Sequence, residues 1–64
     1  MMTVVYVAPT KSIAESIRRA FEAEGIMTVL KESKRKSART NIEILVLESE
    51  LEEAQAILFH ALQR

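Results

Sequence analysis

The residues of this chain that could take part in chemistry are mostly charged, and they gather in two short segments. Residues 31–39 carry five basic side chains against one glutamate. Lysine and arginine neutralise phosphate charge, so this segment predicts contact with a small anion or with nucleic acid. A solvated loop is the simpler interpretation, because the net charge is zero and no aromatic residue is interleaved for base stacking. The candidate anion contacts are Lys11, Lys31, Lys34, Arg35, Lys36 and Arg39.

The second charged segment is acidic and lies around the start of the last predicted helix. It contains Glu48, Glu50, Glu52 and Glu53. Carboxylates at a helix N-terminus are stabilised by the helix dipole, and this is a sufficient explanation for the cluster. Hard divalent cations also bind clustered carboxylates, but nothing else in the sequence supplies the remaining ligands.

The residue types that most enzymes use are scarce in this chain. It has no cysteine, no aspartate and a single histidine, His60. Disulfides and thiolate metal sites are therefore excluded, and a structural zinc site lacks its four ligands. His60 has no evident nucleophile or orienting carboxylate with which to act as a general base. We therefore expect a protein that is not an enzyme and that has no cofactor.

The start of the first predicted helix is a further candidate anion site. Lys11 and Ser12 follow Pro9, and the N–H groups at a helix start attract anions. The glycines of a phosphate-binding loop are absent, however. Ser12 also precedes Glu15 by three residues, which is the spacing of a capping box. A capped helix start is therefore the simpler interpretation.

Hydrophobic periodicity predicts the elements that position these residues. A β-branched and aromatic run before Pro9 is typical of a strand, and Gly25 stands where a left-handed helix C-cap is needed. Ser49 and Glu52 repeat the capping-box spacing ahead of the last apolar stripe. The single predicted domain, residues 1–64, has a strand at 3–8, a helix at 12–24, a strand at 26–31, a basic loop at 32–40, a strand at 41–47 and a helix at 50–63.

Connection rules predict how these elements assemble. A right-handed crossover through the first helix leaves the first two strands parallel, and a simple loop returns the third strand antiparallel. The third strand is the most apolar, as a central strand should be, which predicts the sheet order 1-3-2. Both helices then cover one face. We expect an α+β fold of the β-α-β-β-α type, a split β-α-β unit that resembles a truncated ferredoxin-like sandwich.

The other face of this sheet is expected to be uncovered and apolar. Apolar and polar residues alternate poorly in all three strands, and a contiguous apolar patch marks an interaction site. A chain of 64 residues also buries only a marginal core, for which association with another subunit is a common remedy. We therefore predict a homodimer, or docking of another protein, through the open face or the first strand's edge. The residues expected in this contact are Val4, Tyr6, Met27, Val29, Leu45 and Phe59.

The composition predicts a globular protein that stays in the cytoplasm. The chain is 48% hydrophobic and 28% charged, and its balance of charge argues against a general nucleic-acid binder. Residues 1–8 are apolar but too short and uncharged for a signal peptide. No stretch approaches the length of a bilayer span, so we expect no membrane association.

Three segments of the chain resemble a known family. They are the strand ending in Tyr-Val-Ala-Pro at residues 6–9, the helix end Glu-Ala-Glu-Gly-Ile at 22–26, and the acidic helix start Glu-Leu-Glu-Glu-Ala at 50–54. Together they resemble a family of small bacterial domains described as prokaryotic signal-transducing proteins, a domain of unknown function. The resemblance implies a β-α-β-β-α fold distantly like that of PII-type regulators, and it implies no catalytic residues. The basic loop departs from the family pattern.

Overall fold

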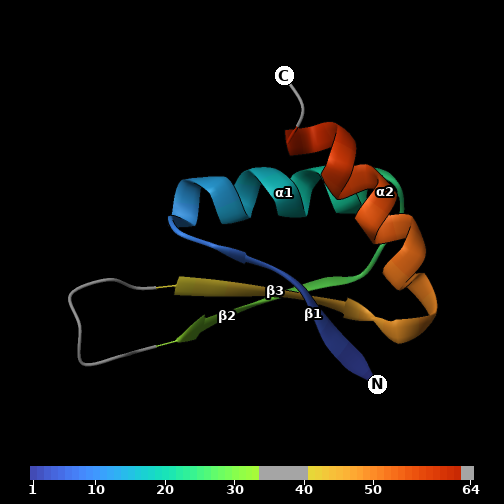
Figure 1. The fold of residues 1–64 in the computed structure, drawn as a ribbon, viewed down its shortest axis with the longest axis horizontal. Coiled ribbons are helices and arrows are strands. Elements are labelled where there is room, and N and C mark those ends of the chain that lie inside the picture. The colour runs from blue at the N-terminus through green and yellow to red at the C-terminus, as the bar shows by residue number, and fades with distance from the viewer. Residues whose placement is uncertain (34–40, 63–64) are drawn as a thin grey trace.

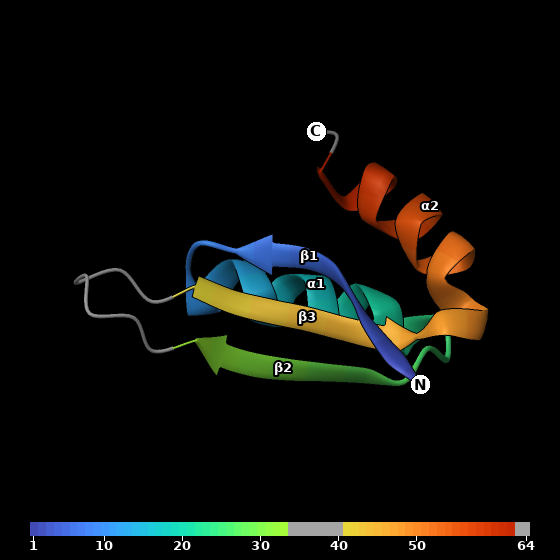
Figure 2. The same ribbon diagram turned by 60° about the horizontal axis from the view of Figure 1, so that its bottom comes forward.

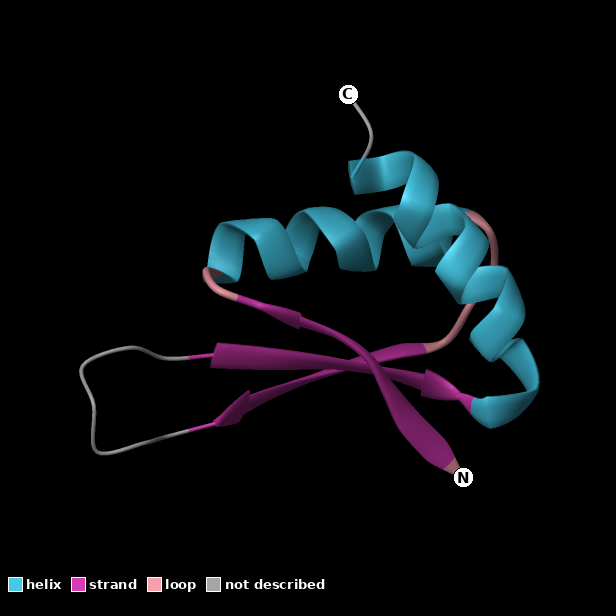
Figure 3. Ribbon diagram, in the orientation of Figure 1, coloured by secondary structure: helices cyan, strands magenta, loops and turns pink. Residues whose placement is uncertain are grey.

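The computed structural model describes residues 1–33 and 41–62. Its strands are β1 (Met2–Ala8), β2 (Thr28–Ser33) and β3 (Asn41–Leu47). Its helices are α1 (Lys11–Ala23) and α2 (Leu51–Leu62), and a short 3-10 turn, η1 (Glu48–Glu50), leads into α2. The described elements therefore follow the predicted order β-α-β-β-α (Figure 3).

The sheet has three strands in the order β1-β3-β2, which confirms the predicted order. Both outer strands run antiparallel to β3, so they are parallel to each other. Figure 1 shows α1 and α2 on the same side of the sheet, and Figure 2 brings the opposite, uncovered side of the strands toward the viewer. The fold is thus the predicted α+β arrangement, with one face of the sheet left open.

The central strand β3 separates the two faces by strict alternation. Ile42, Ile44 and Val46 are buried, whereas the residues between them are only half-buried. Because successive side chains of a strand point to opposite faces, the buried set faces the helices. The buried residues of the sheet and of the helices form one core: Ala8, Ala14, Ile17, Phe21, Ile26, Ile42, Ile44, Val46 and Ala54.

Strand β1 contains an irregularity that alternation alone does not predict. Val4 is the register partner of Leu45, but Tyr6 is the partner of Ile44, so Val5 is an extra residue on the β1 side. This is a β-bulge, which increases local twist. Figure 1 shows β1 crossing β3 at a steep angle near the middle of the sheet.

Helix α1 begins two residues earlier than its capping-box pattern suggests. Thr10 is the N-cap, with an extended backbone, and its hydroxyl accepts a hydrogen bond of 3.1 Å from the N–H of Ile13. Ser12 lies inside the helix, so its predicted role as the cap is wrong. Glu15 instead accepts a hydrogen bond of 2.6 Å from the guanidinium of Arg18.

The end of α1 confirms the role predicted for Gly25. Its φ is +80°, a conformation that a residue without Cβ adopts readily. The N–H of Gly25 donates to the carbonyl of Glu22, and the N–H of Ile26 donates to that of Phe21, both at 3.0 Å. These two bonds form a Schellman motif, in which an apolar residue after the glycine packs back on the helix. Ile26 is therefore part of the helix end and the core, and β2 begins two residues later than predicted.

Helix α2 is held less firmly than α1. Ala54 is its one buried residue, and Leu51, Ile57 and Leu58 pack partly against the core. Its last turns rise away from the sheet (Figure 2), where Phe59 and Leu62 are exposed. Neither helix of the described residues combines the length and the apolar character needed to cross a bilayer.

Candidate self-association surface

The open face of the sheet, the side away from α1 and α2, carries an apolar row across all three strands. Val4, Leu45 and Val29 lie side by side in this row, because Leu45 is the register partner of both valines. Each residue belongs to a different strand, β1, β3 and β2 respectively. We call these three residues the valine–leucine row. A second apolar pair, Met2 and Leu47, lies beside it toward the start of β1.

A charged row lies next to the valine–leucine row on the same face. Glu43 of β3 is the register partner of Val7 on one side and of Lys31 on the other. Glu43 is half-buried, and Val7 and Lys31 are exposed. We call these three residues the charged row. Within the described residues, the open face therefore combines apolar side chains with one positive and one negative charge in adjacent rows.

The exposure of the apolar residues shows that the described chain leaves this face uncovered. Four of them are more than two-fifths accessible to solvent: Val4 at 43%, Val7 at 47%, Val29 at 42% and Met27 at 63%. Scattered single apolar residues are normal on a protein surface. A row that joins all three strands of a small sheet is a contiguous patch, and such patches mark interaction sites.

Four of the six residues predicted for self-association fit this surface. Val4, Val29 and Leu45 form the valine–leucine row. Met27 precedes β2 by one residue and is exposed. Its position, two residues before Val29, continues the open-face alternation of β2.

The other two predicted residues lie elsewhere. Tyr6 was expected on the open face with Val4, and this is wrong because the bulge at Val5 shifts the alternation by one residue. Tyr6 shares its face with buried Ile44 and packs against the core. Phe59 is exposed, but it lies on α2, on the helix side of the sheet, where its ring meets that of His60 edge-on at 6.0 Å between centroids.

Val7 is an exposed open-face residue that sequence reasoning missed. With simple alternation from Val4, residue 7 falls on the helix side, but the bulge places Val7 beside Glu43 on the open face. The run from Thr3 to Ala8 contains no charged residue, so no polar marker in the sequence locates the shift. The same bulge interrupts the outer edge of β1, and bulges are a common protection against edge-to-edge pairing. The geometry therefore favours the face over the β1 edge for association.

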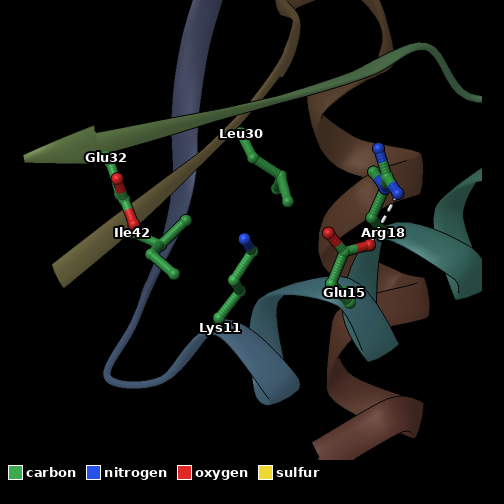
Figure 4. Close-up of a pocket in the computed structure, with 6 residues that line it drawn as sticks. All are labelled: Lys11, Glu15, Arg18, Leu30, Glu32 and Ile42. Carbon is green, nitrogen blue, oxygen red and sulfur yellow. Dashed lines mark hydrogen bonds and ion pairs between the residues drawn. The ribbon is translucent and has the colours of Figure 1, made fainter. Parts of the chain in front are cut away.

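The helix side of the sheet has a groove near the start of α1. Its volume is about 330 Å³, and Leu30 and Ile42 form its apolar floor. Figure 4 shows Lys11 extending into the middle of the groove, with the Glu15–Arg18 pair on one side and Glu32 on the other. Two cations and two carboxylates line it, so their formal charges cancel. The groove does not favour an anion over a neutral molecule.

The described anion candidates do not form one site. Lys11 lines the groove on the helix side, whereas Lys31 is a register partner of Glu43 on the open face. The two lysines therefore lie on opposite sides of the sheet. The remaining predicted contacts, Lys34, Arg35, Lys36 and Arg39, lie outside the described residues.

The acidic segment does not assemble into a metal site within residues 1–33 and 41–62. No group of three or more histidine or acidic side chains in that part of the chain is placed to hold an ion. Glu48 and Glu50 belong to η1, and Glu52 and Glu53 occupy the first turn of α2. This is the position in which the helix dipole stabilises carboxylates.

Comparison with protein families, with curated proteins and with solved structures gives no match to this chain. The resemblance to prokaryotic signal-transducing domains therefore stays a prediction from residues 6–9, 22–26 and 50–54.

Proposed function

We propose that this protein is a non-enzymatic interaction module that associates with a second copy of itself through the open face of its sheet. The observation that carries the proposal is the valine–leucine row, which joins all three strands on the uncovered side. An apolar row of this kind loses unfavourable contact with water when another surface covers it.

The size of the chain supports a second copy as the occupant. A domain of 64 residues buries a smaller fraction of its surface than a larger one, so its core gives limited stability. Within the described residues this core is a single layer between one sheet face and two helices. Stacking a second sheet on the open face adds an apolar layer, as in sandwiches, whose packed sheets lie about 10 Å apart.

The charges on the open face support self-association in particular. Glu43 and Lys31 present one charge of each sign in the same row. A surface that carries both signs can be complementary to itself, as the interface of a two-fold symmetric dimer must be. A partner of uniform charge would leave one of the two side chains facing a like charge.

We further propose a regulatory role inside the cell for this module. The support is the resemblance to prokaryotic signal-transducing domains, together with the scarcity of residue types that catalysis uses. The alternative function is binding of an anion or of nucleic acid by residues 31–39, and its support is the five basic side chains of that segment. Of these five, Lys31 alone belongs to the described residues, and it lies on the open face.

The test of self-association is the solution mass by sedimentation equilibrium over a wide range of concentrations. We expect the wild-type mass to approach twice the chain mass of 7.2 kDa. The variant Val29→Glu places a carboxylate in the valine–leucine row and should shift the mass toward that of a single chain. Val29 is exposed, so this change should leave the fold intact by circular dichroism.

A matched control adds the same charge on the other side of the molecule. Ser16 is exposed on α1, so Ser16→Glu changes the net charge as Val29→Glu does without touching the open face. It should associate like the wild type. A wild-type protein of single-chain mass at every concentration would overturn the proposal, and so would equal effects of the two variants.

A further inference from the structure

Glu43 is an unusual residue for an apolar interaction surface. It lies on the central strand, it is half-buried without any covering partner, and it is one row from Leu45. A surface that covers the valine–leucine row therefore also covers Glu43. Burying a carboxylate without a partner is costly, whereas a buried carboxylate paired with a cation is tolerated.

Among the described residues, Lys31 is the cation on the open face. It is the register partner of Glu43 on β2, yet the one ion pair among the described residues is that of Arg18 with Glu15. Lys31 is exposed, so its ammonium group can turn toward a surface that approaches from outside. The two charges are thus neighbours on one face without being paired to each other within the chain.

We propose that two copies stack open face on open face about a two-fold axis that runs between β2 and β3, so that Glu43 of each copy pairs with Lys31 of the other. This inference rests on the proposed function, and it adds the orientation of the two copies and the residues that determine it. A two-fold operation makes every contact twice, so the dimer contains two such pairs.

The apolar residues fit the same orientation. When the two-fold axis runs parallel to the strands, the rotation places β3 of one copy over β2 of the other. Each residue keeps its position along the strand direction, so residues that are register partners in one chain also lie opposite each other between the copies. Glu43 and Lys31 are at one level, and Leu45 and Val29 are at the next. Leu45 then meets Val29 of the second copy while Glu43 meets Lys31. In this arrangement β1 has no strand of the second copy opposite it, because it lies outside the β3-β2 pair. Val4 and Val7 therefore lie at the rim of the contact, and Leu45 and Val29 form its apolar centre.

Charge reversal tests the orientation in two steps. K31E places a glutamate opposite Glu43 of the second copy, and E43K places a lysine opposite Lys31. Each variant alone therefore creates two like-charge contacts per dimer, and we expect its dissociation constant to rise about tenfold or more. Sedimentation equilibrium measures the constants, and circular dichroism checks that both variants fold.

Mixing the two reversed variants separates pairing between copies from pairing within a chain. A K31E chain carries two glutamates in this row, and an E43K chain carries two lysines. The mixed dimer has opposite charges at both contacts, so an equimolar mixture should associate about as tightly as the wild type. If these side chains do not approach those of the second copy, the mixture should stay as weak as its components, because no charge contact between copies is changed.

The possible results discriminate this inference from the proposed function. Association that returns on mixing supports the orientation, and a mixture no tighter than its components overturns it. If Val29→Glu disrupts a wild-type dimer but the mixture stays dissociated, the orientation is wrong while self-association stands. A wild-type protein that never dimerises overturns both.

If a reversed variant fails to fold, K31Q, E43Q and the double variant replace it. Each single change should then weaken the dimer more than the double change does, and equal or additive losses would contradict the pairing.

Discussion

Phe21 and Ile26 are joined by a backbone hydrogen bond of 3.0 Å, from the N–H of Ile26 to the carbonyl oxygen of Phe21, and both side chains are buried in the core. The bond closes the Schellman motif at the end of α1. The same turn therefore ends the helix and delivers Ile26 to the space between the helices and the sheet. Its formation depends on the positive φ of Gly25.

Replacement of Gly25 should be costly for conformational reasons alone. A Cβ added at this position meets nothing within 4 Å, so no steric clash contributes. The left-handed conformation itself disfavours alanine, and we expect Gly25→Ala to lower the free energy of unfolding by about 1 kcal/mol. Urea denaturation measures the change. Asparagine tolerates this conformation better, so Gly25→Asn should lose less; an equal loss for both variants would contradict this explanation.

The start of α1 offers a direct comparison of two hydroxyl residues. Thr10→Ala removes the side chain that accepts from the N–H of Ile13, and loss of such a cap costs about 1 kcal/mol. Ser12 is exposed inside the first turn, so Ser12→Ala should change the free energy of unfolding by less than about 0.5 kcal/mol. Thr10→Ser keeps the hydroxyl and serves as the conservative control. The reverse order of effects would restore Ser12 as the cap.

The two phenylalanines of the chain should respond in opposite ways to truncation. Phe21 is fully buried, whereas Phe59 is 60% exposed. Phe21→Ala creates a cavity and should cost about 3–5 kcal/mol, which can unfold a domain of this size. Phe21→Leu is the milder variant that keeps the loss measurable by urea denaturation. Phe59→Ala should cost less than about 0.5 kcal/mol, and a large loss there would show that α2 docks more firmly than its exposure indicates.

Substitutions at two neighbouring residues of β2 should affect association and folding stability separately. Val29 is on the open face, and Leu30 packs against the core on the other side of the strand. Leu30→Ala should lower the free energy of unfolding by about 2 kcal/mol without weakening the association of the folded chains. Val29→Ala should weaken association and change the stability of the single chain little. Sedimentation equilibrium and urea denaturation at low concentration measure the two effects, and equal behaviour of the variants would contradict the assignment of faces.

The sequence was sufficient to predict the topology because its signals there are independent and agree. The apolar character of the third strand predicted the central position of β3, and Gly25 marked the end of α1 through its unique backbone freedom. The start of α1 was misplaced because Thr10 and Ser12 are both good caps, and Glu15 made the pattern at Ser12 look complete. Glu15 pairs with Arg18 instead, because the two side chains are three residues apart and lie next to each other on the helix.

The open face was harder to predict than the topology. Alternation correctly placed Val29 and Leu45 on the open face, because Glu43 marks the solvent-facing side of the central strand. In β1 no charged residue shows which side chains face solvent. The bulge at Val5 places Tyr6 on the helix side and Val7 on the open face, the reverse of what a regular strand would give. A bulge depends on how the strand twists against its neighbour, and that information lies in the tertiary structure.

The valine–leucine row draws its three residues from strands that are far apart along the chain, so it exists only after the sheet has formed. A second copy that binds there binds the native state and not the unfolded chain. By mass action, the melting temperature of the proposed dimer must then rise with protein concentration. The quantity of protein in solution thereby becomes one of the determinants of its thermal stability.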